Sequence, residues 1–89
     1  MIITKHYSVK GEVQGVFFRF NTKRKADELG LSGWVKNMAD GPVEVVLQGP
    51  AENVKEMVTA LKKGFPGSKV NSVTELGEVD KRFAGFSIL

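Results

Sequence analysis

The sequence predicts one α+β domain in which an antiparallel sheet carries two helices on one face. Its 89 residues are enough for a single hydrophobic core and too few for two. Segments in which every second residue is apolar alternate with segments in which apolar residues recur every three or four positions. Glycine and proline lie between most of these segments, where they favour turns.

The first half of the chain has the order strand, helix, strand. Residues 3–13 alternate between apolar and polar side chains, which is typical of a half-buried strand. From about Phe18 to Leu29 the apolar residues follow a helical period, and Gly30 is placed to end the helix. Residues 31–37 alternate again and indicate a second strand.

The second half has the same order after a turn at 38–42, which contains the turn-forming pair Asp-Gly. Residues 43–48 indicate a third strand. A helix is predicted over 50–63, with a proline near its start and the clearest apolar stripe in the chain. Residues 70–79 indicate a fourth strand with a bulge near its glycine, and residues 83–88 a short closing strand.

This order of elements predicts how the chain is arranged in space. With right-handed crossovers, the two strand–helix–strand units interleave into an antiparallel sheet with both helices on one face, which is the ferredoxin-like sandwich. The sequence contains no internal repeat, linker or low-complexity segment. We therefore expect one βαββαβ domain over residues 1–89.

Composition and charge exclude several classes of protein. Apolar residues make up 42% and charged residues 26%, and no apolar run approaches the ~20 residues of a membrane-spanning helix. The N-terminus lacks the long apolar segment of a signal peptide, so we expect a cytoplasmic protein. The net charge of +3 is compatible with an anionic ligand and too diffuse to indicate nucleic acid. We expect a monomer that binds neither nucleic acid nor membranes.

The residue inventory leaves few routes to catalysis. There is no cysteine, and the only histidine, His6, lies on the polar side of the first strand without a second ligand beside it. The sequence has no Ser-His pair, no carboxylates with metal-ligand spacing and no GxxxxGK[ST] loop. We therefore expect no metal and no cofactor. An enzyme of this kind would depend on positioning and electrostatics and would need a substrate with a good leaving group.

The segment 11–19, GEVQGVFFR, joins the first strand to the first helix and has the features of an anion-binding loop. N–H groups at a helix start have no partner within the helix. Gly15 permits close approach of a ligand, and Arg19 adds a fixed positive charge, so a phosphate or a carboxylate would fit. The same residues also suit an ordinary connection between a strand and a helix, and spacing alone does not decide.

Two motifs carry a resemblance to a known family. The segment 11–19 resembles the acylphosphatase signature G-x-V-Q-G-V-x-F-R. A second signature of that family, G-W-V-x-N-x-x-x-G-x-V-x-x-x-x-x-G, is matched at Gly33, Trp34, Val35, Asn37, Gly41, Val43 and Gly49. The resemblance covers the chain from end to end. It implies a hydrolase that splits the carboxyl-phosphate bond of small acyl phosphates into a carboxylate and inorganic phosphate, without a cofactor.

The resemblance also implies roles for individual residues. Arg19 would bind the phosphate as a catalytic residue, and Asn37 would orient the nucleophilic water. The loop backbone would wrap the phosphate oxygens; this phosphate-binding loop comprises Gln14, Gly15, Val16, Phe17, Phe18 and Arg19. A phosphate oxygen of the substrate would accept the proton of the water. Family members commonly have Thr after the asparagine, whereas this chain has Met38, a change expected to bear on the rate.

Other interpretations of these residues stay open. Judged by position alone, Asn37 is a turn residue at the end of a strand, Gln14 braces the loop, and Trp34 is an aromatic residue on the sheet face. The alternative function is a non-catalytic module that binds phosphate or an acyl phosphate. RNA binding is a third use of this fold, but the RNP motif is absent. No segment is marked as a site for the acyl group, so broad specificity is expected.

Overall fold

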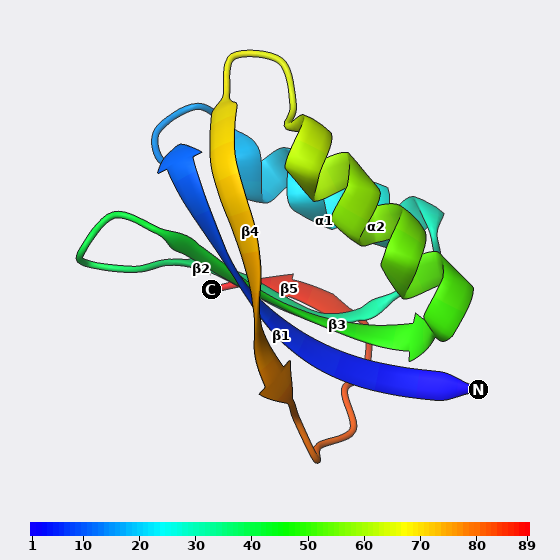
Figure 1. The fold of residues 1–89 in the computed structure, drawn as a ribbon. Coiled ribbons are helices and arrows are strands. Elements are labelled where there is room, and N and C mark those ends of the chain that lie inside the picture. Colours follow the sequence, from blue (N-terminus) through cyan, green and yellow to red (C-terminus); the bar gives the residue numbers. More distant parts are fainter.

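The computed structural model describes residues 1–89, which form five strands and two helices (Figure 1). In chain order these elements are β1 (Ile2–Glu12), α1 (Phe18–Glu28), β2 (Ser32–Asn37), β3 (Val43–Pro50), α2 (Ala51–Lys63), β4 (Lys69–Glu78) and β5 (Phe86–Ile88). Every predicted element is present, although its ends differ by up to a few residues. Pro50 ends β3 and immediately precedes α2 instead of lying inside the helix.

The strands form one sheet in the order β4-β1-β3-β2-β5. β1 and β3 are neighbours, and β4 and β2 flank them, all in antiparallel register. Both helices lie on one face of this sheet, as Figure 1 shows. The predicted ferredoxin-like sandwich is therefore confirmed for the four long strands and the two helices. Neither helix is long and apolar enough to cross a membrane.

The fifth strand is an exception to the predicted antiparallel sheet, because β5 pairs with β2 in parallel register. β4 lies at one edge and β5 at the other, so the segment 79–85 must carry the chain from one edge to the other. Figure 1 shows this segment passing beyond the end of the sheet before the chain turns back. β4 runs opposite to β2, and the reversal therefore aligns β5 with β2.

The core lies between the sheet and the helices. The valines and leucines of the strands alternate toward the helices, and the apolar stripe predicted for α2 faces them, with Val54, Met57 and Leu61 buried and Val58 half-buried. The buried cluster comprises Tyr7, Val9, Val13, Phe18, Ala26, Leu31, Val35, Val43, Val45, Leu47, Val54, Met57, Leu61 and Phe86. α1 thus rests on the sheet through Phe18 and Ala26.

The pairing of β1 with β4 contains the predicted bulge. His6 lies opposite Gly77, whereas the next residue, Tyr7, lies opposite Glu75. Leu76 is therefore the extra residue of β4, and its side chain is exposed. The bulge predicted near Gly77 is confirmed.

Gly33 allows β2 and β3 to approach each other closely. Its φ is 132°, and a Cβ atom at this position would collide with the carbonyl oxygen of Val46 on β3. Its N–H donates to the carbonyl oxygen of Gly85 at 3.0 Å, ahead of β5. Gly33, which belongs to the second motif, therefore connects β2 both to β3 and to the segment that precedes β5.

Two connections meet at one end of the sheet. Val9 of β1 and Asn37 of β2 both lie opposite Val43 of β3. The loop that follows β1 and the turn that follows β2 consequently leave the sheet at the same end. This arrangement brings the two motifs together.

Candidate active site

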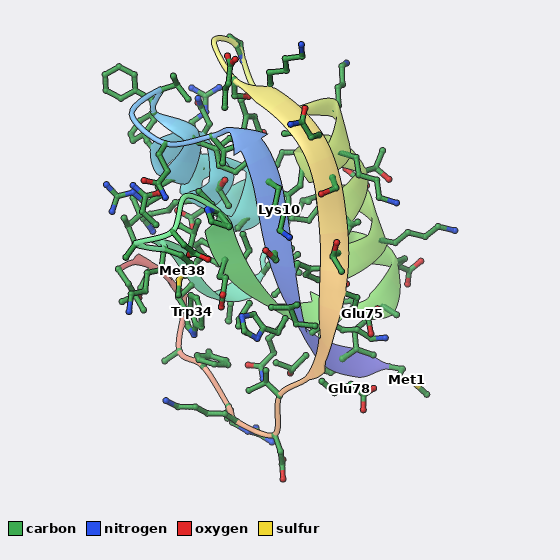
Figure 2. The ribbon with its side chains drawn as sticks, turned by 60° about the vertical axis from the view of Figure 1, so that its left-hand side comes forward. Met1, Lys10, Trp34, Met38, Glu75 and Glu78 are labelled. Atoms are coloured by element: carbon green, nitrogen blue, oxygen red, sulfur yellow. The ribbon has the colours of Figure 1, made fainter.

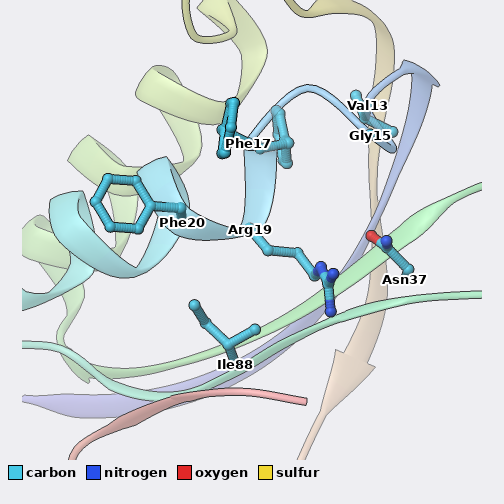
Figure 3. A pocket seen from close by; sticks show the side chains of 8 residues that line it. Val13, Gly15, Phe17, Arg19, Phe20, Asn37 and Ile88 are labelled. Atoms are coloured by element: carbon cyan, nitrogen blue, oxygen red, sulfur yellow. The ribbon is translucent and has the colours of Figure 1, made fainter.

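A cavity of about 320 Å³ opens at this end of the sheet (Figure 3). The loop after β1, the first turn of α1, the end of β2 and β5 contribute to its wall. Its lining residues are Val13, Gly15, Phe17, Phe18, Arg19, Phe20, Asn37 and Ile88. No Asp or Glu is among them, and Arg19 is the only lining residue with a charged side chain. The structure thus places Arg19 and Asn37, the two predicted catalytic residues, in one cavity.

The loop between β1 and α1 has unpaired main-chain donors. The N–H groups of Gln14 through Phe17 donate to no main-chain acceptor within the protein. The first turn of α1 adds more donors, because no side chain caps this helix. Gly15 and Phe17 have left-handed φ angles of 74° and 59°, a feature of loops that turn successive N–H groups to one side. The loop therefore has the free donors of an anion-binding nest.

Arg19 is the second residue of α1 and is held against β5. Its Nη1 donates to the main-chain oxygen of Leu89 at 2.9 Å. One helical turn later, Lys23 Nζ donates to the carbonyl oxygen of Phe86 at 2.9 Å. These contacts fix α1 on β5 and leave most of the five N–H donors of the guanidinium available. In Figure 3 the guanidinium of Arg19 points toward the side chain of Asn37.

Asn37 is the last residue of β2 and lines the cavity. Its Oδ1 atom is buried and has no hydrogen-bond partner in the protein. Leaving a buried acceptor unpaired costs roughly 1–3 kcal/mol. A small donor such as water would satisfy this oxygen, and the amide nitrogen could at the same time donate to an acceptor.

Gln14 connects the loop to the turn that follows Asn37. Its Nε2 atom lies 2.8 Å from the carbonyl oxygen of Met38, 2.8 Å from that of Gly41 and 3.1 Å from that of Pro42. The side chain therefore braces two connections that are far apart in the sequence. The turn is closed by a second bond, from the N–H of Met38 to the carbonyl oxygen of Pro42 at 2.8 Å.

The other residues of the predicted phosphate-binding loop have different surroundings. Val16 is half-buried and packs on the core, and it is not among the residues that line the cavity. Phe18 lines the cavity and is also buried, with its ring edge-on to Phe65 at a centroid distance of 5.2 Å. The side chains of Val16 and Phe18 therefore anchor this loop on the core.

Trp34 lies on the sheet face that the helices leave open (Figure 2), and His6 packs against it there. His6 Nε2 is 2.7 Å from Oε1 of Glu44, and the two aromatic rings meet edge-on at 5.5 Å. Neither residue lines the cavity. This placement agrees with the interpretation of both as residues of the sheet surface.

Sequence reasoning missed Phe20 and Ile88 as residues of the cavity wall. The available signal was Phe20 itself, a large apolar residue beside the buried stripe of an otherwise polar helix. Ile88 carried no local signal, because its role depends on β5 pairing with β2.

The chain is similar to known proteins both in sequence and in structure. The family model described as Acylphosphatase matches residues 5–88. An acylphosphatase of Rhizorhabdus wittichii is 52% identical over 71 residues, which are 80% of this chain and 72% of that protein. One of Thiobacillus denitrificans is 43% identical over 83 residues, which are 93% and 92% of the two chains. The structure of an acylphosphatase from Coxiella burnetii matches with a TM-score of 0.94 at 36% identity, over 99% of this chain and 93% of that one. The chain therefore belongs to the acylphosphatase family.

Proposed function

We propose that this chain hydrolyses the carboxyl-phosphate bond of small acyl phosphates, with Arg19 and Asn37 as its catalytic residues. Family membership supports the activity. The observation that carries the assignment of residues is the buried, unpaired Oδ1 of Asn37 in the cavity that Arg19 also lines. In this proposal Arg19 binds the phosphoryl group, and Asn37 holds a water beside it.

The phosphoryl group binds to the loop between β1 and α1. Free N–H groups of the loop and of the helix start donate to its oxygens, and the Arg19 guanidinium neutralises their charge. Charge on the phosphoryl oxygens persists and is redistributed in the transition state, so fixed donors stabilise it without reorganisation. The bond from Arg19 to Leu89 keeps the guanidinium in place.

The water binds to Asn37. The water donates one hydrogen to Oδ1 of Asn37, which satisfies this unpaired acceptor. The same hydrogen bond directs a lone pair of the water oxygen toward phosphorus. Gln14 is a positioning residue in this scheme, since it holds the turn after Asn37 to the loop that binds phosphate.

The chemical step then needs no further acid. The water oxygen forms a bond to phosphorus while the bond from phosphorus to the acyl oxygen breaks, and the carboxylate leaves with the electron pair. Carboxylic acids have pKa values of about 4, so the leaving group departs unprotonated at neutral pH. A phosphate oxygen accepts a proton of the water, which yields inorganic phosphate.

Hydrolysis of benzoyl phosphate by wild type, Arg19→Ala and Asn37→Ala tests the proposal. Removal of one transition-state donor typically lowers kcat by about 10²–10³, and a similar loss is expected for each variant. Arg24→Ala and Asn71→Ala are matched controls, because both residues are exposed and lie outside the cavity. A wild type that is no faster than buffer, or a fully active Asn37→Ala, would contradict the proposal.

Calorimetry with inorganic phosphate separates catalysis from binding alone. Arg19→Ala should lose most of the affinity for phosphate, whereas Asn37→Ala should retain it because the free N–H groups and Arg19 are unchanged. Phosphate binding without turnover in wild type would instead identify a non-catalytic binding module. The monomeric state and the cytoplasmic location stay predictions, and light scattering in solution tests the first.

A further inference from the structure

The cavity has two chemically different walls. One wall carries Arg19, Asn37 and the loop main chain, which are suited to a phosphoryl group and a water. The other carries the side chains of Phe17, Phe20 and Ile88, which offer no polar atom. A ligand that fills the cavity therefore needs an anionic end and an apolar end.

The apolar wall is exposed to an extent that folding does not require. Phe17, Phe20 and Ile88 leave 80%, 56% and 41% of their surface open to solvent. Phe18, between the two other phenylalanines, is buried and supplies the core contact of this segment. Exposed large apolar side chains gathered at one cavity commonly mark a ligand site.

The backbone conformation of Phe17 is a further indication that this residue has a functional role. Its φ and ψ of 59° and 22° are left-handed, and it is the only residue other than glycine with a positive φ. Bulky residues rarely adopt this conformation, whereas glycine adopts it without strain. A strained, exposed phenylalanine beside a cavity is the kind of outlier that points to function.

The geometry of the reaction indicates which part of the substrate meets this wall. In an in-line displacement the attacking water and the leaving group lie on opposite sides of phosphorus. In Figure 3 Asn37 and Phe20 lie on opposite sides of the Arg19 side chain, with Ile88 below it. With water on Asn37 and the phosphoryl group on Arg19, the acyl group extends toward Phe20 and Ile88.

We propose that Phe17, Phe20 and Ile88 form an acyl-binding subsite, so that the enzyme prefers acyl phosphates with an aromatic or large apolar acyl group. This inference rests on the proposed function. It differs from the sequence-based expectation of broad specificity, because the side chains of Phe17, Phe20 and Ile88 offer the acyl group an apolar surface. The preference arises from burial of apolar surface and from stacking on the exposed rings.

The test compares kcat/KM for acetyl phosphate and 3-phenylpropanoyl phosphate. The parent acids have closely similar acidity, so the two leaving groups are matched and differ chiefly in apolar size. Wild type should favour the phenylpropanoyl substrate by about tenfold or more. Phe20→Ala should remove most of this preference, and Phe17→Gly, which keeps the left-handed backbone without strain, should also reduce it.

Leu76→Ala is the matched control, because it removes an equally exposed apolar side chain from β4, outside the cavity. Its preference should equal that of wild type. Equal kcat/KM for both substrates in wild type, or an unchanged preference in Phe20→Ala and Phe17→Gly, would overturn the subsite and leave the proposed function standing. Failure to hydrolyse either substrate would overturn both. A wild-type dimer that Phe20→Ala converts to a monomer would overturn the subsite by assigning these side chains to a contact between copies.

Discussion

Removal of the Gln14 side chain should damage both the stability of the fold and the geometry of the site. In the structure its amide nitrogen faces three carbonyl oxygens of the 38–42 turn, at 2.8, 2.8 and 3.1 Å. The perturbation is Gln14→Ala, which deletes all of these contacts without adding a clash. We expect the turn to separate from the phosphate-binding loop and Asn37 to lose its fixed position.

The loss of stability in Gln14→Ala can be calculated from the number of hydrogen bonds that the Gln14 amide nitrogen makes. An amide nitrogen carries two, so it makes at most two full hydrogen bonds, and the third contact is shared. Each bond contributes a net ~0.5–1.5 kcal/mol, and the exposure of Gln14 favours the lower half of this range, so about 1–2 kcal/mol of stability should be lost. For a domain of this size that corresponds to a fall in Tm of roughly 5–15 °C. If the same energy is lost at the transition state, kcat falls about tenfold.

The assay is a thermal melt together with kcat for benzoyl phosphate. Gln48→Ala is the matched control, because Gln48 is also a bracing glutamine, with bonds to Thr4 and to the carbonyl oxygen of Lys81 at 2.8 and 2.7 Å. It lies opposite Thr4 near the start of β1, far from the cavity. Gln48→Ala should therefore lower Tm and leave kcat near the wild-type value.

A second variant tests whether the side chain at position 14 must donate hydrogen bonds to these carbonyl oxygens. Gln14→Glu has nearly the same shape but places a carboxylate against three carbonyl oxygens, so it should be less stable than Gln14→Ala. The reasoning is refuted if Gln14→Ala melts at the wild-type temperature. It is also refuted if Gln48→Ala lowers kcat as much as Gln14→Ala does.

Three further changes have defined outcomes. Gly33→Ala should destabilise the protein by more than about 1 kcal/mol in urea unfolding, because the new Cβ collides with the carbonyl oxygen of Val46; an unchanged midpoint would contradict this. Burial raises the pKa of Tyr7 above its usual 10.0, so the unfolded chain releases this proton first and stability should fall as pH rises above 10. Tyr7→Phe should make that fall shallower in denaturation measured from pH 9 to 11.5, and an identical slope would show that Tyr7 does not contribute. Deleting Leu89 removes the main-chain oxygen that Arg19 binds and should weaken phosphate binding several-fold in calorimetry, whereas Leu89→Ala keeps that oxygen and should lose much less.

The sequence alone determined the elements and their order, because these depend on neighbouring residues. The period of apolar positions located both helices and most strands, and Gly77 predicted the bulge that β4 contains. The handedness of crossovers then restricted the arrangement of the long strands to the sheet that is observed. The two motifs predicted Arg19 and Asn37 as site residues by resemblance, and their roles remain to be tested by mutation.

Only the tertiary structure showed which segments far apart in the sequence contact one another. The parallel pairing of β5 with β2, the bond from Arg19 to Leu89 and the reach of Gln14 to the 38–42 turn all join segments far apart in the sequence. The unpaired oxygen of Asn37 is equally a property of its surroundings. A local period specifies which side of a strand is buried, but not which distant segment covers that side or which polar atom is left without a partner. Such contacts arise from packing the whole chain, and Ile88 lines the cavity only because β5 pairs with β2.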